Sequence, residues 1–155
     1  MPLKKMLAEA EFANVPVVEH PFSSQRLKGL YVDGVITINS SVEHTTVEKA
    51  CILAEELGHH YTTIGNILNQ NNVVNRKQEL RARSWAYERL VPLNGIVEAS
   101  LAGVKGKHEI AEFLEVTEDF LVDAINRYKE KYGLYVIVDR YAIHFEPLFV
   151  LEIFE

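Results

Sequence analysis

A hairpin followed directly by a capped amphipathic helix is the feature that most constrains the fold. Residues 30–38 contain two β-rich runs joined by Asp33-Gly34, a dipeptide that favours a two-residue turn because both turn positions need a positive φ. Thr45 with Glu48 three residues later forms a capping box, which predicts that a helix begins there. Apolar residues then recur at helical spacing to about residue 62, and Gly58 in this stripe would let a neighbouring element approach closely.

The remaining segments predict an α+β fold, because helical periodicity gives way to β-like runs near the C-terminus. The expected elements are a helix over residues 3–13, a loop over 66–75, a helix over 76–90, a short helix over 91–101, a helical pair over 107–131 that meets at 115–117, and strands within 134–154. The sequence predicts a core over residues 1–101. Residues 102–155 would add the helical pair and the C-terminal β region, packed on the core as one compact unit.

Charge and cysteine content narrow the class of protein. The net charge of −6 would repel a polyanion on average, which argues against direct nucleic-acid binding. Cys51 is the single cysteine and lies in an apolar helical run, so we expect a buried free thiol, as suits a reducing cytoplasm. Neither a signal-peptide pattern nor an apolar run long enough to cross a bilayer is found, so we expect no membrane segment.

Three residues of the helix after the hairpin could carry chemistry. Glu55 and His59 are one helical turn apart and can point at one metal ion, and Glu56 would place its carboxylate beside that ion. This is the spacing of the H-E-x-x-H helix, with glutamate in the first position. His60 is an alternative ligand, since it lies one turn after Glu56, but that register puts Leu57 in the position of the base. By spacing alone, a solvated helix face is the commoner arrangement for such residues.

Two blocks of sequence resemble the ImmA/IrrE family of metallopeptidases. Residues 52–63, which contain E-E-L-G-H, are similar to the metal-binding helix of that family. Residues 79–92 match its pattern E-x-x-A-x-x-(F/W)-A-x-x-x-L-x-P, and residues 28–39 resemble the hairpin that precedes the metal helix. The resemblance runs in order over about residues 26–92 and implies a zincin-like core with two metal-site helices.

The resemblance also implies roles for individual residues. The metal ligands would be Glu55, His59 and Glu79, where Glu79 is the leading glutamate of the second block. Glu56 would be the catalytic general base. The expected cofactor is Zn²⁺ or another divalent metal, with one coordination position left for water. The chain would thus be a metal-dependent endopeptidase.

The family resemblance implies a substrate as well. It would be a helix-turn-helix transcriptional repressor of a phage or integrative element, cleaved in the cytoplasm of a bacterial host. A second hypothesis is a non-catalytic module that binds such a repressor. A third is a DNA-binding regulator that uses the helix-turn-helix-like residues 109–125, although Glu118, Asp119 and Asp123 occupy the part of the second helix where a DNA reader needs donors.

Four other residues lie near these blocks in the sequence. His44 precedes the metal helix, and a loop or cap role fits it better than a role at the rim of the site. Tyr31 and Tyr61 could stabilise an oxyanion, although aromatic packing is the simpler expectation for both. The helical spacing of Trp85 predicts a core position.

Overall fold

The computed structural model describes residues 1–62 and 72–153, with side chains for 1–62 and 76–153. The chain forms two compact units, Met1–Ala86 and Tyr87–Glu155. Both combine helices with a small sheet, so the fold is α+β as the sequence predicts. The division after residue 101 stays a prediction.

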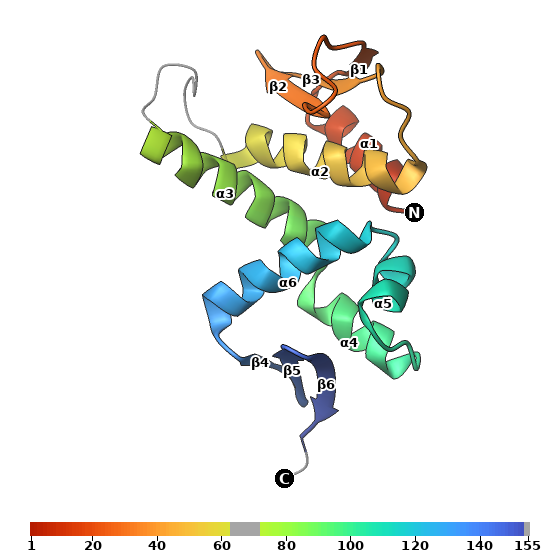
Figure 1. The fold of residues 1–155 in the computed structure, drawn as a ribbon, viewed down its shortest axis with the longest axis vertical. Helices are drawn as coiled ribbons and strands as arrows, with labels where there is room; N and C mark the ends of the chain where they lie inside the picture. Colours follow the sequence, from red (N-terminus) through yellow and green to blue (C-terminus); the bar gives the residue numbers. More distant parts are fainter. Residues whose placement is uncertain (63–71, 154–155) are drawn as a thin grey trace. The chain divides into compact units, whose positions relative to one another are not determined.

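The first unit places a small sheet along one side of a long helix (Figure 1). Its elements in chain order are α1 (Pro2–Phe12), β1 (Val17–His20), β2 (Gly29–Val32), β3 (Val35–Asn39), α2 (Thr46–Thr62) and the first part of α3 (Asn72–Leu90). The strand order is β1-β3-β2, in which β2 pairs antiparallel and β1 parallel with β3. The predicted hairpin is confirmed, because Asp33 and Gly34 both have a positive φ. The parallel strand β1 was not predicted.

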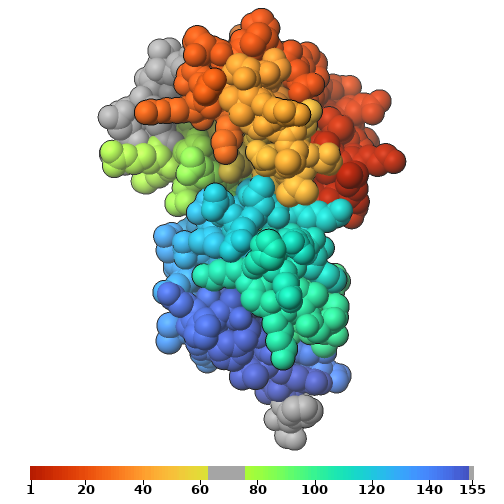
Figure 2. All heavy atoms as spheres, turned by 45° about the vertical axis from the view of Figure 1, so that its right-hand side comes forward, coloured from red at the N-terminus to blue at the C-terminus, as the bar shows by residue number. Residues whose placement is uncertain are grey.

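The hydrophobic core of this unit lies between the sheet and the helices. Ile36 and Ile38 of β3 and Leu53 and Leu57 of α2 are almost completely buried, and α1 packs against α2. Figure 2 shows the orange atoms of the hairpin region and the yellow atoms of α2 in one continuous surface. This packing fixes the rotation of α2 and therefore the direction in which its polar residues point.

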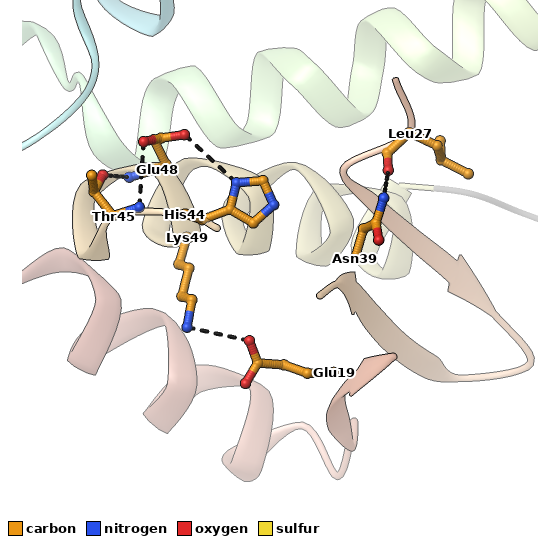
Figure 3. Close-up of polar contacts among 7 residues, drawn as sticks. All are labelled: Glu19, Leu27, Asn39, His44, Thr45, Glu48 and Lys49. Atoms are coloured by element: carbon orange, nitrogen blue, oxygen red, sulfur yellow. Dashed lines mark hydrogen bonds and ion pairs between the residues drawn. The ribbon is translucent and has the colours of Figure 1, made fainter. Parts of the chain in front are cut away.

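The capping box at the start of α2 is present as predicted (Figure 3). Glu48 N donates to Thr45 Oγ1 at 3.1 Å, and Thr45 N donates to Glu48 Oε1 at 3.3 Å. The hydrogen bond from the main chain of Thr45 lowers the pKa of Glu48. Desolvation opposes this lowering, and the Thr45 hydroxyl and His44 add to it. His44 Nδ1 lies 3.6 Å from Glu48 Oε2, so His44 sits at the helix start, where a cap role was expected.

A buried asparagine holds the loop between β1 and β2 in place. Asn39 is fully buried, and its side-chain nitrogen donates to the Leu27 carbonyl oxygen at 2.8 Å (Figure 3). The same nitrogen donates to the Ser24 carbonyl oxygen at 2.9 Å. The Asn39 side-chain oxygen accepts from the main-chain nitrogens of Phe22 and Ser41, and from the Ser41 hydroxyl. Asn39 therefore fixes the chain just before it enters β2.

Two sequence expectations about α3 need correction. The helix begins at Asn72, four residues before the predicted start at Arg76. Asparagine is a weak helix former, but its cost of about 0.5 kcal/mol per residue is too small to stop a long helix from extending. The rest of the predicted loop, residues 66–71, lies outside the described residues. Trp85 is half-buried and stacks on Tyr61, so it is not a core residue.

The second unit contains helices packed on an antiparallel sheet. Its elements are α4 (Leu93–Leu101), α5 (Lys107–Leu114), α6 (Glu118–Tyr132), β4 (Tyr135–Val138), β5 (Tyr141–Phe145) and β6 (Leu148–Glu152), with strand order β4-β5-β6. The predicted helical pair is confirmed: Glu115 ends α5 in the left-handed region, and the Thr117 side chain caps α6. Among the described residues no helix is long and apolar enough to cross a membrane.

Candidate metal centre

Helix α2 carries the candidate residues on its less buried side. Its apolar stripe of Ala50, Leu53, Ala54 and Leu57 is buried, so Glu55, Glu56, His59 and His60 are left half-buried at the border of the core. Cys51 of the same helix is a buried free thiol, as predicted. The capping box fixes where α2 begins and thus which residues reach this border.

A close crossing of α2 and α3 brings the two halves of the site together. A Cβ placed on Gly58 would lie 2.2 Å from the Ala82 carbonyl oxygen, so only glycine permits this approach. This confirms the close approach predicted at Gly58. One residue further along α2, His59 Nε2 lies 3.1 Å from Glu79 Oε2 of α3. The structure therefore places Glu79 beside His59, as the resemblance implied.

The His59–Glu79 pair is electrostatically coupled. The hydrogen bond from His59 lowers the pKa of Glu79, against an opposing effect of burial. Arg83, one turn along α3, adds to this lowering, with Nε 3.2 Å from Glu79 Oε1. Burial alone would lower the pKa of His59, but the hydrogen bond to Glu79 and the neighbouring carboxylates outweigh it, so this pKa is raised. Glu79 is thus held as a carboxylate facing the imidazole.

Glu56 lies between this pair and strand β2. A Cβ placed on Gly29 of β2 would be 3.2 Å from Glu56 Cγ and 3.3 Å from Oε1, so the side chain of Glu56 rests against the strand. Burial raises the pKa of Glu56 to about 7; the His59 charge opposes this rise, and the charges of Glu55 and Glu79 add to it. A carboxyl group with a pKa near neutrality can both take up and release a proton under ordinary conditions.

Three of the predicted site residues are thus brought together, and the role of Glu55 stays a prediction. Glu55 lies one turn before His59 on α2 and contributes to the electrostatics of His59 and Glu56. Within residues 1–62 and 76–153, no set of three His, Cys, Asp or Glu side chains is arranged to hold a metal ion. The structure shows the His59–Glu79 pair and leaves the third ligand to be tested.

The geometry of the pair fits a bound zinc ion. With ligand distances of about 2.1 Å and tetrahedral angles, two zinc ligands lie about 3.4 Å apart, within a few tenths of an ångström of the 3.1 Å between His59 Nε2 and Glu79 Oε2. An imidazole nitrogen and a carboxylate oxygen are both common zinc donors. His59 Nδ1 is buried without a hydrogen-bond partner among the described residues, so the ring orientation depends on packing and on Glu79.

His60, the alternative ligand, has a different partner. Its Nδ1 lies 2.7 Å from the Tyr31 hydroxyl of β2, and the two rings meet edge to face with centroids 5.5 Å apart. Tyr61 also packs edge to face on His60 and stacks on Trp85 at 5.1 Å. The contact with Tyr31 leaves Nε2 of the His60 ring unused. A metal role for His60 through this nitrogen therefore stays an alternative prediction.

Sequence reasoning missed two neighbours of the site, Arg83 and Gly29. The role of Arg83 could have been predicted from the sequence, because an arginine four residues after a helical glutamate is a standard ion-pair spacing. The role of Gly29 could not have been predicted from the sequence, because its contact with Glu56 depends on the tertiary packing of β2 on α2.

The site combines three features of a metallopeptidase-type protein. They are a helix that bears Glu56 and His59, a second helix that supplies Glu79, and a hairpin beside them. Residues 10–126 match the family model Peptidase_M78, described as the IrrE N-terminal-like domain. The chain belongs to this family, which confirms the resemblance drawn from residues 52–63 and 79–92. Comparison with curated proteins gives no match. Membership in a peptidase family implies a hydrolase with a protein substrate and a metal cofactor, typically zinc.

Proposed function

We propose that this protein is a zinc-dependent endopeptidase that cleaves a helix-turn-helix repressor of a phage or mobile element in the bacterial cytoplasm. The observation that carries the proposal is the 3.1 Å contact between His59 Nε2 and Glu79 Oε2, with the Glu56 carboxyl group beside it. In this proposal Glu55 completes the ligand set with His59 and Glu79.

The ion held there would polarise the substrate carbonyl and lower the pKa of the attacking water. Glu56 accepts a proton from that water as the water oxygen adds to the carbonyl carbon. Glu56 then passes the proton to the amide nitrogen as the C–N bond breaks, which leaves a free amine and a carboxylic acid. Burial raises the pKa of Glu56 in the metal-free protein, which favours a carboxyl group that can hold a proton between the two steps.

Strand β2 offers a place for the substrate backbone. It lies at one edge of the order β1-β3-β2 and pairs with β3 on one side only. Leu30 and Val32 on this edge strand are exposed. An extended segment of the substrate can add to such an edge through main-chain hydrogen bonds, which would hold its peptide bonds along the strand next to Glu56.

Co-expression with candidate helix-turn-helix repressors of phages and mobile elements tests the proposal. We expect the wild type to cleave the repressor, Glu56→Gln to leave it intact, and Glu98→Gln to behave as the wild type. Glu98 is a matched control, since it is an exposed glutamate of α4. Cleavage that survives in Glu56→Gln would overturn the mechanism.

The same experiment separates the second hypothesis, a non-catalytic module that binds the repressor. It has one supporting observation, namely that no three-ligand set is arranged among the described side chains. In that case the repressor would co-purify uncut with the wild type and with Glu56→Gln alike. A DNA-binding role is disfavoured by the exposed carboxylates of Glu118 and Asp119 at the start of α6, where phosphate donors would be needed.

A further inference from the structure

Two residue pairs join α2 to strand β2 along one helix face. Glu56 and His60 are four residues apart and so lie on the same side of α2. Gly29 of β2 rests against Glu56, and Tyr31 of β2 hydrogen-bonds His60. Because side chains alternate along a strand, positions 29 and 31 point to the same face of the sheet. His60, which holds the Tyr31 hydroxyl, therefore lies on the side of α2 that carries the general base, about one helical turn, or 5.4 Å, further along the helix axis.

A peptidase of this kind needs a hydrogen-bond donor for the carbonyl oxygen. As water adds to the carbonyl carbon, that oxygen gains negative charge, and a donor fixed in advance stabilises the charge at little reorganisation cost. A phenol hydroxyl is a suitable donor if a neighbouring group already fixes its position. Tyr31 meets this condition, because it is half-buried and its oxygen lies 2.7 Å from His60 Nδ1.

Tyr61, the other tyrosine considered for this role, is placed less well. Its ring stacks on Trp85 of α3, with ring planes 28° apart, and its side chain is exposed. No hydrogen bond of the Tyr61 hydroxyl is found among the described residues, so none of them fixes its oxygen toward β2.

We infer that the Tyr31 hydroxyl donates a hydrogen bond to the oxygen of the scissile carbonyl and that His60 is the positioning residue for this hydroxyl. In this arrangement His60 carries its hydrogen on Nδ1 and donates it to the Tyr31 oxygen. The phenolic hydrogen is then free for the substrate. The inference rests on the proposed function and assigns a role to a residue pair outside the ligand set and the general base.

The test is steady-state cleavage of a purified helix-turn-helix repressor, the one identified by the co-expression experiment, with zinc present. We expect Tyr31→Phe to lower kcat by about 100-fold, as for loss of one oxyanion donor, with KM changed by less than about twofold because the bond forms in the transition state. Zinc content and Tm should stay at the wild-type values. Tyr61→Phe, which removes the hydroxyl of the neighbouring tyrosine, is the matched control and should keep the wild-type kcat.

Variants of His60 test its positioning role. His60→Leu should lower kcat as much as Tyr31→Phe does, and the double variant should be no slower than either single one, because both changes remove the same interaction. His60→Gln, whose amide can still donate to the Tyr31 oxygen, should recover part of kcat.

Each other outcome has a defined meaning. A Tyr31→Phe variant within about threefold of the wild-type kcat would overturn the inference while leaving the proposed function standing. A variant that loses zinc or unfolds would also overturn it, since Tyr31 would then be a structural residue. A wild type that does not cleave the repressor would refute the proposed function, and the inference with it.

Discussion

His59 of α2 and Glu79 of α3 make a hydrogen bond of 3.1 Å between Nε2 and Oε2, although they come from two separate helices. The crossing at Gly58 and Ala82 makes this contact geometrically possible, and the buried stripe of α2 sets the rotation that points His59 toward α3. The candidate site thus depends on how closely two helices approach as much as on the residues that they carry.

Glu55 is expected to be the third ligand. Glu55→Gln should weaken zinc binding by at least about tenfold. Even the loss of a residue that only hydrogen-bonds a metal ligand lowers metal affinity by about 10–100-fold. Glu55→His should retain zinc, because an imidazole is a good zinc donor and this change restores the H-E-x-x-H spacing. Competition with a chromophoric chelator measures both affinities. Equal zinc affinity in the wild type and in Glu55→Gln would exclude Glu55 from the ligand set.

The raised pKa of Glu56 makes the stability of the metal-free protein depend on pH. Its carboxyl group has a pKa of about 7 in the folded protein, against an ordinary value of 4.5 for glutamate. The protonated form is thus favoured by folding, and this contribution is fully present below pH 4.5 and is lost as the pH rises through 7.

Glu56→Gln removes this ionisation. We expect the metal-free variant to match the wild type at pH 4.5 and to exceed it at pH 8 by about 3 kcal/mol in free energy of unfolding. Urea unfolding of both proteins at the two pH values measures the difference. A wild type that is as stable as the variant at pH 8 would show that Glu56 is not desolvated.

The crossing of α2 and α3 should tolerate no side chain at Gly58. A methyl group there would meet the main chain of Ala82, with 2.2 Å to its oxygen, so the helices must move apart. We expect Gly58→Ala to destabilise the protein by about 1–3 kcal/mol and to reduce zinc binding, because His59 moves away from Glu79.

Gly95→Ala is the comparison for that change. Gly95 also lies in a helix, but its added Cβ would meet mainly the end of the Leu114 side chain, at 3.0 Å. Side-chain ends can shift, so the cost should be below about 1 kcal/mol. Thermal unfolding and zinc titration of both variants check this. Similar effects for the two would mean that the α2–α3 contact is not what Gly58 protects.

Asn39 should contribute to stability and to the placement of β2. Asn39→Ala leaves two carbonyl oxygens and two main-chain N–H groups without their partner, and we expect a loss of about 3 kcal/mol or more. Asn39→Asp keeps the acceptor for Phe22 and Ser41 but loses the donor to Ser24 and Leu27. Its cost should fall between the wild type and Asn39→Ala in chemical denaturation. No loss of stability in Asn39→Ala would contradict the role of this hydrogen-bond network.

The sequence predicted those parts of the fold that local chemistry determines. Asp33-Gly34 specifies the hairpin turn through its positive φ values, and the pair Thr45 and Glu48 specifies the start of α2 through two reciprocal hydrogen bonds. The C-terminal strands and the helical pair were predictable for the same reason, since their periodicity and the Thr117 cap are local signals.

Non-local contacts were harder to predict. The parallel pairing of β1 with β3 depends on chain segments far apart, and Val17 and Val18 alone give no strand signal strong enough to find it. The buried network of Asn39 is invisible in a sequence where the residue simply ends a strand. The approach of Glu79 to His59 came from the family resemblance, since no local rule connects two helices across an intervening loop.

Zinc content tests the central claim most directly. The wild type and Glu56→Gln should each bind close to one zinc per chain after zinc loading and gel filtration, measured by elemental analysis, because Glu56 is not a ligand. His59→Gln and Glu79→Gln should lose the ion while remaining folded by circular dichroism. If folded wild-type protein binds no zinc, or if both substitutions leave one zinc in place, then His59 and Glu79 do not form a metal centre.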